Sequence, residues 1–213
     1  METCPNCNTP IKTSMFSSVE LYNKVTARLI NAYQTSQADG YCTKCGEKLL
    51  AAAQQKAVEE REQLTREIAA MLDAIPVVSI PHPPGWEYEV IGIVTGQSTT
   101  GTGVFSEFSA SVNDIFGTQS GRFNKKIKAG EAFSTAQLRE QTLDLGGHAV
   151  LGTDIDYSEV GGERGMLMVC MTGTAIRLKN LNILGAEKAG EIKHLQQIYT
   201  RLKFLRQFDL THK

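Results

Sequence analysis

The chain has 213 residues and a mass of 23.3 kDa, enough for one large domain or two small ones with a buried core. Its 41% hydrophobic and 21% charged residues exclude a disordered chain, a collagen and a disulfide-dense miniprotein. The net charge of −1 gives no global basic field for nucleic acid, and no apolar run approaches the ~20 residues that span a bilayer. The first residues lack the pattern of a signal peptide, so we expect a cytoplasmic protein.

Four of the five cysteines form two Cys-x-x-Cys pairs, Cys4 with Cys7 and Cys42 with Cys45. Each pair predicts a tight turn that directs two sulfurs at one point, and two such turns give the tetrahedral four-sulfur cage that Zn²⁺ binds. Because sulfur fills all four positions, we predict one structural zinc per chain. Two redox pairs or a disulfide are the alternatives, and a cytosolic context disfavours disulfides. We expect Gly46, which follows the second pair, to adopt a positive φ that turns its amides toward the sulfurs.

Residues 1–46 are therefore predicted to form a zinc-ribbon-like module with an inserted helix. That helix is expected over residues 19–34, where apolar residues recur at helical spacing after Ser17 or Ser18, either of which can cap it. We expect its apolar face to pack against the ribbon or a neighbouring element.

A long connecting helix is predicted over residues 47–75, a stretch without Gly or Pro that is rich in Ala, Glu, Gln, Leu and Lys. It ends before Pro76 because a proline disfavours the helical conformation of the residue that precedes it. Apolar residues seven positions apart leave two alternatives open, packing on its own chain or a coiled coil between subunits. The prolines that follow predict a stiff, extended linker over residues 76–86.

A further domain is predicted over residues 87–178. Its expected elements are, in chain order, a strand, two helices and two strands, over residues 87–95, 104–116, 123–145, 149–160 and 166–178. This order predicts an α+β fold, a small antiparallel sheet with helices on one face. The last strand is apolar on both faces, so we expect it to be central in the sheet. One face can pack on the helices, and the other needs a different cover, such as another subunit. Cys170 in this strand is predicted to be a buried core thiol.

Four segments of this domain carry a resemblance, Val90–Gly96, Gly147–Gly152, Asp154–Tyr157 and Gly173–Ala175. In order and register they resemble the bacterial YbjQ family, which is labelled as heavy-metal-binding, over residues 87–178. The resemblance implies a small subunit of the YbjQ or dodecin kind that assembles into a ring-like homo-oligomer, expected to be a pentamer. The family has no established enzymatic activity, and the sequence has no evident catalytic constellation, so we expect a non-enzymatic protein.

Asp154 and Asp156 alternate onto one face of their predicted strand, with Glu159 and Glu163 nearby in the chain. Such carboxylates fit a hard cation such as Ca²⁺ or Mg²⁺, whereas a soft metal requires a thiolate, which this stretch lacks. The alternative is that the two aspartates bond backbone amides at a subunit boundary. His148 stands where members of the family more often carry a small or carboxylate residue, so no family role transfers to it.

Residues 179–213 are predicted to form a basic amphipathic helix after an irregular start. Residues 177–213 carry eight basic and three acidic side chains, whereas residues 76–176 carry six basic and eleven acidic ones. We expect the helix to pack on its own acidic assembly or on an acidic protein partner. Contact with an anionic membrane stays open and is not favoured.

Together these patterns predict a non-enzymatic, ring-forming, zinc-containing binding or scaffold protein. One alternative is a protein that handles a metal or small ligand through Asp154 and Asp156 at subunit interfaces. The other is a zinc-ribbon adaptor for nucleic acid. It is not favoured, because residues 1–46 carry only four basic and three acidic side chains without a basic cluster.

Overall fold

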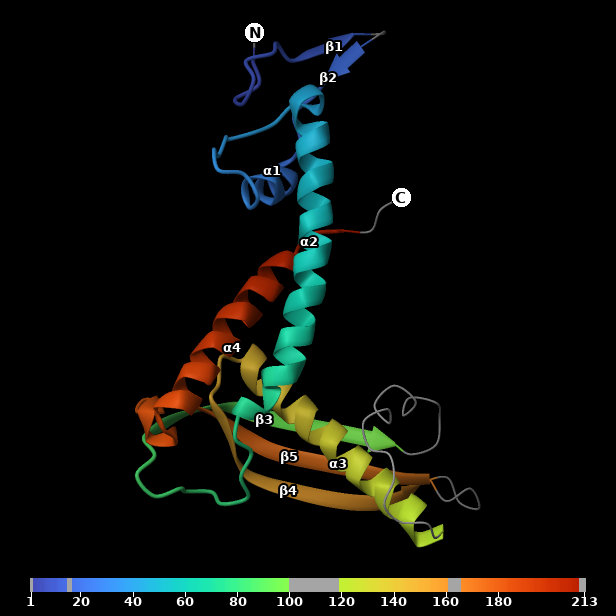
Figure 1. The fold of residues 1–213 in the computed structure, drawn as a ribbon, viewed down its shortest axis with the longest axis vertical. Helices are drawn as coiled ribbons and strands as arrows, with labels where there is room; N and C mark the ends of the chain where they lie inside the picture. Colours follow the sequence, from blue (N-terminus) through green and yellow to red (C-terminus); the bar gives the residue numbers. More distant parts are fainter. Residues whose placement is uncertain (1, 15–16, 100–118, 161–165, 211–213) are drawn as a thin grey trace. The chain divides into compact units, whose positions relative to one another are not determined.

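The computed structural model describes residues 2–14, 17–99, 119–160 and 166–210 (Figure 1). The chain divides into two compact units. Unit 1 comprises Met1–Glu67 and Thr200–Lys213, and unit 2 comprises Ile68–Tyr199. Unit 1 is therefore discontinuous in sequence, since the last residues of the chain belong with the first.

Unit 1 begins with an antiparallel pair of strands, followed by two helices. These elements are β1 (Lys12–Ser14), β2 (Ser17–Val19), α1 (Lys24–Asn31) and the larger part of α2 (Thr43–Met71). The helix predicted over 19–34 is thus shorter than expected. The side chain of Asn23 caps α1 by accepting the backbone N–H of Thr26 (2.8 Å). The residues before Asn23 are extended, with β2 paired to β1 and Leu21 bridged to Cys42.

The small core of unit 1 joins α1 to the start of α2. Ala27, Ile30 and Tyr41 are buried there, with Leu49 and Leu50 of α2 partly buried against them. Ala27 and Ile30 lie on the apolar face that the sequence predicts for this helix, although α1 has only eight residues.

Helix α2 begins at Thr43 rather than at the predicted Glu47. Its first turn therefore contains Cys45 of the second cysteine pair. It ends at Met71 and continues as the 3₁₀ turn η1 (Leu72–Ala74), just before the proline that was expected to terminate it. Ala57 and Leu64, two members of the predicted apolar stripe, are buried within the chain.

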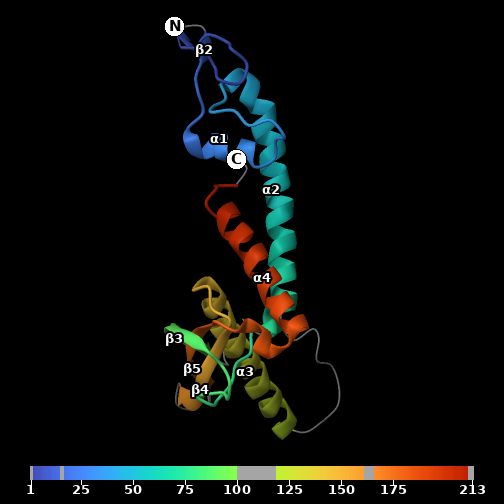
Figure 2. The same ribbon diagram turned by 90° about the vertical axis from the view of Figure 1, so that its left-hand side faces the viewer.

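Unit 2 contains a three-stranded antiparallel sheet with a long helix on one face, as Figures 1 and 2 show. Its elements are β3 (Tyr88–Thr99), α3 (Gln119–Asp144), β4 (Ala149–Val160) and β5 (Met166–Leu178). The strand order β3-β5-β4 places β5 at the centre, and this confirms the predicted α+β class and the central position of the last strand. The helix predicted over 104–116 and the connection at 161–165 lie outside the described residues.

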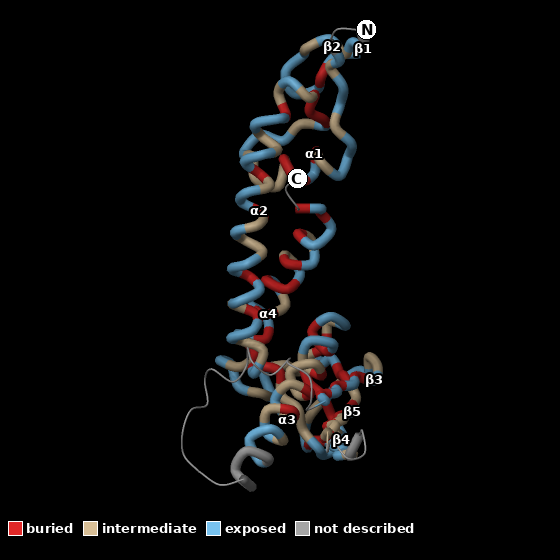
Figure 3. The backbone as a smooth tube through the Cα atoms, turned by 90° about the vertical axis from the view of Figure 1, so that its right-hand side faces the viewer, coloured by how far each residue is buried: buried red, intermediate tan, exposed pale blue. Residues whose placement is uncertain are grey.

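Helix α3 lies very close to the sheet. A Cβ atom on Gly96 of β3 would lie 2.2 Å from the carbonyl oxygen of Ser134 on α3, so only glycine allows this approach. Leu138 of α3 is fully buried with Val94 and Val169 of the sheet. Figure 3 shows buried residues both on α3 and on the strands beside it. This layer is the main core of unit 2.

The chain's own linker extends the sheet beside β4 and helps to cover one end of its second face. Residues 76–80 pair with β4, where the Val78 N–H donates to the Val150 carbonyl and the Val150 N–H donates to that of Pro76 (both 2.9 Å). Residues 81–86 contain bends and a turn, so the expected extended linker is wrong for this part. Trp86 and residues of the 3₁₀ helix η5 (Leu181–Leu184) pack against the buried cluster that contains Ile176 and Leu178. At this end, the cover that was expected from another subunit is therefore supplied within the chain.

Helix α4 (Ala186–Leu205) follows η5 and has the predicted amphipathic character. Its apolar side chains, among them Ile192, Leu195, Leu202 and Leu205, are buried, whereas Lys193 and Lys203 are exposed. Across the described ranges, each helix falls short of the combined length and apolarity that a membrane span requires.

Candidate metal centre

The first cysteine pair lies in a tight loop held by its own backbone. The Asn8 N–H donates to the Cys4 carbonyl and the Cys4 N–H donates to the Thr9 carbonyl (both 2.9 Å). Asn8 has a φ of 56°, a left-handed conformation that asparagine tolerates better than most residues and that reverses the chain after Cys7. Among the described residues of 1–46, a positive φ occurs at Asn8.

The second pair lies at the N-terminus of α2. Cys42 precedes the helix and Cys45 is in its first turn, where the Gly46 N–H donates to the Cys42 carbonyl (2.7 Å). The expected positive φ at Gly46 is wrong, because Gly46 is helical. Glycine is needed there for space instead, since a Cβ atom would lie 2.7 Å from the ring of Tyr22.

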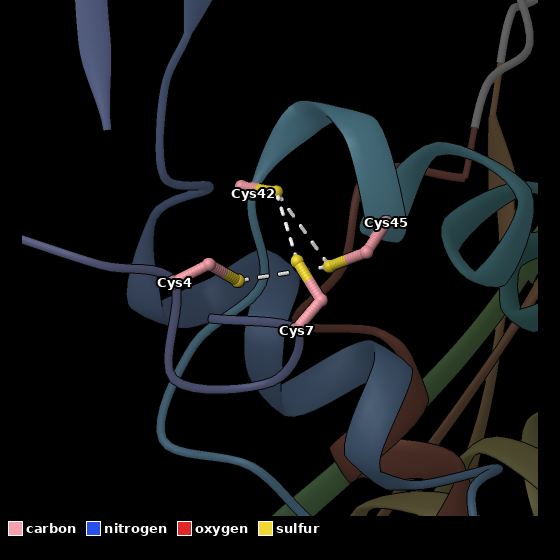
Figure 4. Close-up of side chains that lie close together, drawn as sticks. All are labelled: Cys4, Cys7, Cys42 and Cys45. Atoms are coloured by element: carbon pink, nitrogen blue, oxygen red, sulfur yellow. Dashed lines mark hydrogen bonds between the residues drawn. The ribbon is translucent and has the colours of Figure 1, made fainter. Parts of the chain in front are cut away.

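These two turns bring the four sulfurs together, as the spacing predicts (Figure 4). All four Sγ atoms lie within 4.8 Å of one another. Cys4 to Cys45, Cys7 to Cys42 and Cys42 to Cys45 are each 3.7 Å apart. A tetrahedral Zn²⁺ with bonds of about 2.3 Å requires sulfurs about 3.8 Å apart, so the four residues fit such an ion. A disulfide would require about 2.05 Å, so the cysteines are unbridged.

The four thiols differ in exposure and in acidity. Cys4 and Cys42 are buried, whereas Cys7 is exposed. A hydrogen bond between Cys7 Sγ and the Thr9 hydroxyl (3.2 Å) lowers the pKa of Cys7 to about 6 and favours its thiolate. Burial raises the pKa of Cys45 to about 12, even though the Asn6 amide donates to its sulfur (3.4 Å). A metal ion bound to Cys45 therefore displaces a proton.

Asp154 and Asp156 share one face of β4, as predicted, and both are exposed. They line a shallow concavity of about 330 Å³ on the face of the sheet opposite α3. The other lining residues are Thr95, Gly96, Gln97, Cys170, Met171 and Thr172. Asp156 accepts a hydrogen bond from the Ser158 hydroxyl (3.4 Å). The side chain of Glu159 and all of Glu163 lie outside the described residues.

The concavity also contains a thiol that the sequence reasoning missed. Cys170 of β5 is directly opposite Asp156 of β4 and is only partly buried, so the prediction of a buried core thiol is wrong. The bounds predicted for the two strands contained the necessary signal, because pairing Val160 with Met166 as antiparallel neighbours brings Asp156 opposite Cys170.

His148 has a structural position at the end of the sheet. Its Nδ1 accepts the backbone N–H of Leu178 (3.0 Å), which requires that nitrogen to be unprotonated. Burial lowers the pKa of His148, so the ring is kept neutral and bonds the end of β5.

Comparison with known proteins concerns the part of the chain that contains the sheet. A solved structure of a protein of unknown function from the DUF74 family of Pediococcus pentosaceus ATCC 25745 is similar, with 12% sequence identity and a TM-score of 0.37. The match covers 50% of this chain and 100% of that chain. Residues 75–179 match the YbjQ family, described as "Putative heavy-metal-binding". Residues 75–179 thus belong to the YbjQ family, and the four-cysteine cluster lies outside them, in the N-terminal part of the chain.

Proposed function

We propose that Cys4, Cys7, Cys42 and Cys45 hold one structural Zn²⁺ per chain. The observation that carries this proposal is the set of three sulfur–sulfur distances of 3.7 Å, which are those of a tetrahedral zinc site. Sulfur occupies all four positions and leaves none for water or substrate, as in structural sites. A buried core as small as that around α1 gains much of its stability from such an ion.

Metal analysis of the purified full chain tests this proposal. We expect one zinc per chain by inductively coupled plasma mass spectrometry, retained in Cys170→Ser and lost in Cys42→Ser. Cys170 is the matched control, since it is a free cysteine outside the cluster. Purified protein that contains no zinc and takes up none after reduction would contradict the proposal.

For the whole chain we propose a non-enzymatic, cytoplasmic, homo-oligomeric binding or scaffold protein, in which YbjQ-family domains form a pentameric ring. Exposed apolar side chains on the edge strand β3 support self-association. Val90 is 68% exposed and Ile93 is 77% exposed, and large apolar side chains of this kind are common at subunit interfaces. Native mass spectrometry tests the oligomer, and a monomer at micromolar concentration would contradict it.

A second candidate function is the binding of a hard cation or small polar ligand by Asp154 and Asp156. The concavity that both aspartates line, together with hydroxyl and amide groups, favours it. Isothermal titration with Ca²⁺ and Mg²⁺ would show one site that Asp156→Asn weakens and Glu140→Gln leaves unchanged. If titration with Ca²⁺ and titration with Mg²⁺ both gave no heat of binding, neither cation would be a ligand of this site.

A further inference from the structure

A cluster in unit 1 joins segments from both ends of the chain. Its centre is Glu60 of α2, whose carboxylate accepts two hydrogen bonds from the Arg201 guanidinium (2.7 and 2.8 Å). Tyr33, which follows α1, donates its hydroxyl proton to the same carboxylate (2.6 Å). The side chains of Arg201 and Glu60 are 33% and 30% exposed, so water screens this pair less than a surface ion pair.

Aromatic rings complete the surroundings of Arg201. Its guanidinium carbon lies 5.4 Å from the centre of the Tyr33 ring and 5.1 Å from that of Phe204. Arg28 of α1 approaches the Phe204 ring as well, at 5.7 Å. These distances are within the range of favourable cation–π interactions. Tyr33, Glu60, Arg201 and Phe204 form what we call the Arg201 cluster.

The hydrogen bonds that Glu60 accepts change the pKa of its carboxyl group. Hydrogen bonds from Arg201, followed by that from Tyr33, lower the pKa of Glu60 even though partial burial acts in the opposite direction. Burial and the neighbouring Glu60 carboxylate raise the pKa of Tyr33, so its hydroxyl keeps the proton that it donates. The cluster is thus an ion pair with a neutral phenol as a further donor.

The position of Tyr33 depends on the segment that contains the second cysteine pair. Tyr41, which directly precedes Cys42, is buried against α1 and donates its hydroxyl proton to the Asn31 side chain (2.7 Å). The same Asn31 side chain exchanges two hydrogen bonds with the backbone of Ala38. Asn31 is the last residue of α1, two positions before Tyr33. A series of contacts therefore leads from Tyr41, beside Cys42, through Asn31 to Tyr33 of the Arg201 cluster.

We infer that metal binding by the four cysteines and docking of the C-terminal segment 200–208 on unit 1 are coupled, through the position of α1 and Tyr33. This inference rests on the proposed zinc site. Zinc holds Cys42 and Tyr41 in place, and these hold α1 where Tyr33 meets Glu60 and Arg201. Because binding linkage is reciprocal, loss of zinc loosens the C-terminal segment, and loss of Arg201 weakens the retention of zinc by the same factor.

Hydrogen exchange of the full chain tests the first direction. Zinc-loaded protein is compared with protein stripped of zinc by a chelator under reducing conditions. We expect amides of residues 202–208 to exchange about fivefold faster or more after stripping, a factor at the lower end of usual coupling. Amides of β5 in unit 2 serve as the internal control and should keep their protection.

Variants test the second direction through the zinc affinity, measured by equilibrium competition with a coloured chelator. We expect about fivefold weaker zinc binding by Arg201→Met and a smaller weakening by Tyr33→Phe, which keeps the ring and removes only the hydroxyl. Arg206→Met is the matched control, because it removes an exposed arginine just beyond α4 and should bind zinc as the unaltered chain does. Unchanged hydrogen-exchange protection of the α2 amides over residues 47–67 shows that unit 1 of each variant is folded.

The outcomes separate the two proposals. A chain that binds no zinc overturns both the zinc site and the coupling. Stoichiometric zinc with unchanged exchange at residues 202–208 after stripping overturns the coupling alone. Equal zinc affinities of Arg201→Met, Arg206→Met and the unaltered chain also overturn the coupling and leave the zinc site intact.

Discussion

The side-chain amide of Gln141 on α3 bonds both backbone groups of Thr95 on the edge strand β3. Its oxygen accepts the Thr95 N–H (3.1 Å) and its nitrogen donates to the Thr95 carbonyl. One turn earlier, Gln137 accepts the N–H of Gln97 (2.8 Å). An edge strand presents unpaired backbone groups that can pair with another chain, and the two glutamines occupy these positions on β3.

Replacing Gln141 with alanine is expected to destabilise unit 2 by about 1–2 kcal/mol and to promote self-association, because it leaves the Thr95 groups unpaired. Urea unfolding and light scattering at several concentrations measure the two effects. Glu140→Ala changes an exposed neighbour on the same helix and should behave as the unaltered chain. Equal stability and scattering for both variants would show that the edge needs no such protection.

Replacing Gly96 with alanine is expected to cost about 1–3 kcal/mol of unfolding free energy, since the new Cβ would collide with the Ser134 carbonyl and push α3 from the sheet. Gly190→Ala is the matched control. It lies inside α4 with nothing within 4 Å of the added atom, so it should stabilise the helix by about 0.5–1 kcal/mol. Denaturant titration measures both, and a harmless Gly96→Ala would contradict the close packing of α3.

Replacing Cys42 with serine is expected to unfold part of unit 1 and to leave the sheet of unit 2 folded. Without zinc, residues 2–46 should lose protection in hydrogen exchange and become sensitive to protease, because structural zinc sites supply folding free energy. The sheet of unit 2 should keep its protection, since its core is built from its own strands and α3. Protease resistance that is unchanged across residues 2–46 would refute this expectation.

Acidification is expected to destabilise unit 2 through His148. Burial lowers the pKa of His148 in the folded chain below its usual 6.5, so the unfolded chain binds the proton more readily. The stability that the neutral ring provides is complete above about pH 6.5 and decreases as the pH falls below that value. Urea titrations at pH 7.5 and 5.5 measure the decrease. His148→Gln should reduce it, whereas replacing the exposed loop residue His82 with glutamine should not.

Features that depend on residues close in the chain could be predicted from the sequence. The bounds predicted for β4 and β5 agree with the structure, because alternation of apolar residues and a glycine-rich connection are local patterns. The long helix α2 follows from its composition and from Pro76. The four-sulfur cluster could also be anticipated, since each Cys-x-x-Cys turn is local and only the meeting of two turns had to be assumed.

Other features depend on contacts between distant segments, and only the tertiary structure decided them. Glu60 and Arg201 are 141 positions apart, and neither spacing nor composition indicates that they pair. The need for glycine at position 46 comes from a neighbouring tyrosine ring rather than from backbone conformation. Helix α1 begins only at Lys24, because Val19 pairs with β1 and Leu21 pairs with Cys42 instead of continuing the helix. Local sequence determines which elements can form, whereas packing between elements determines where they end and which side chains meet.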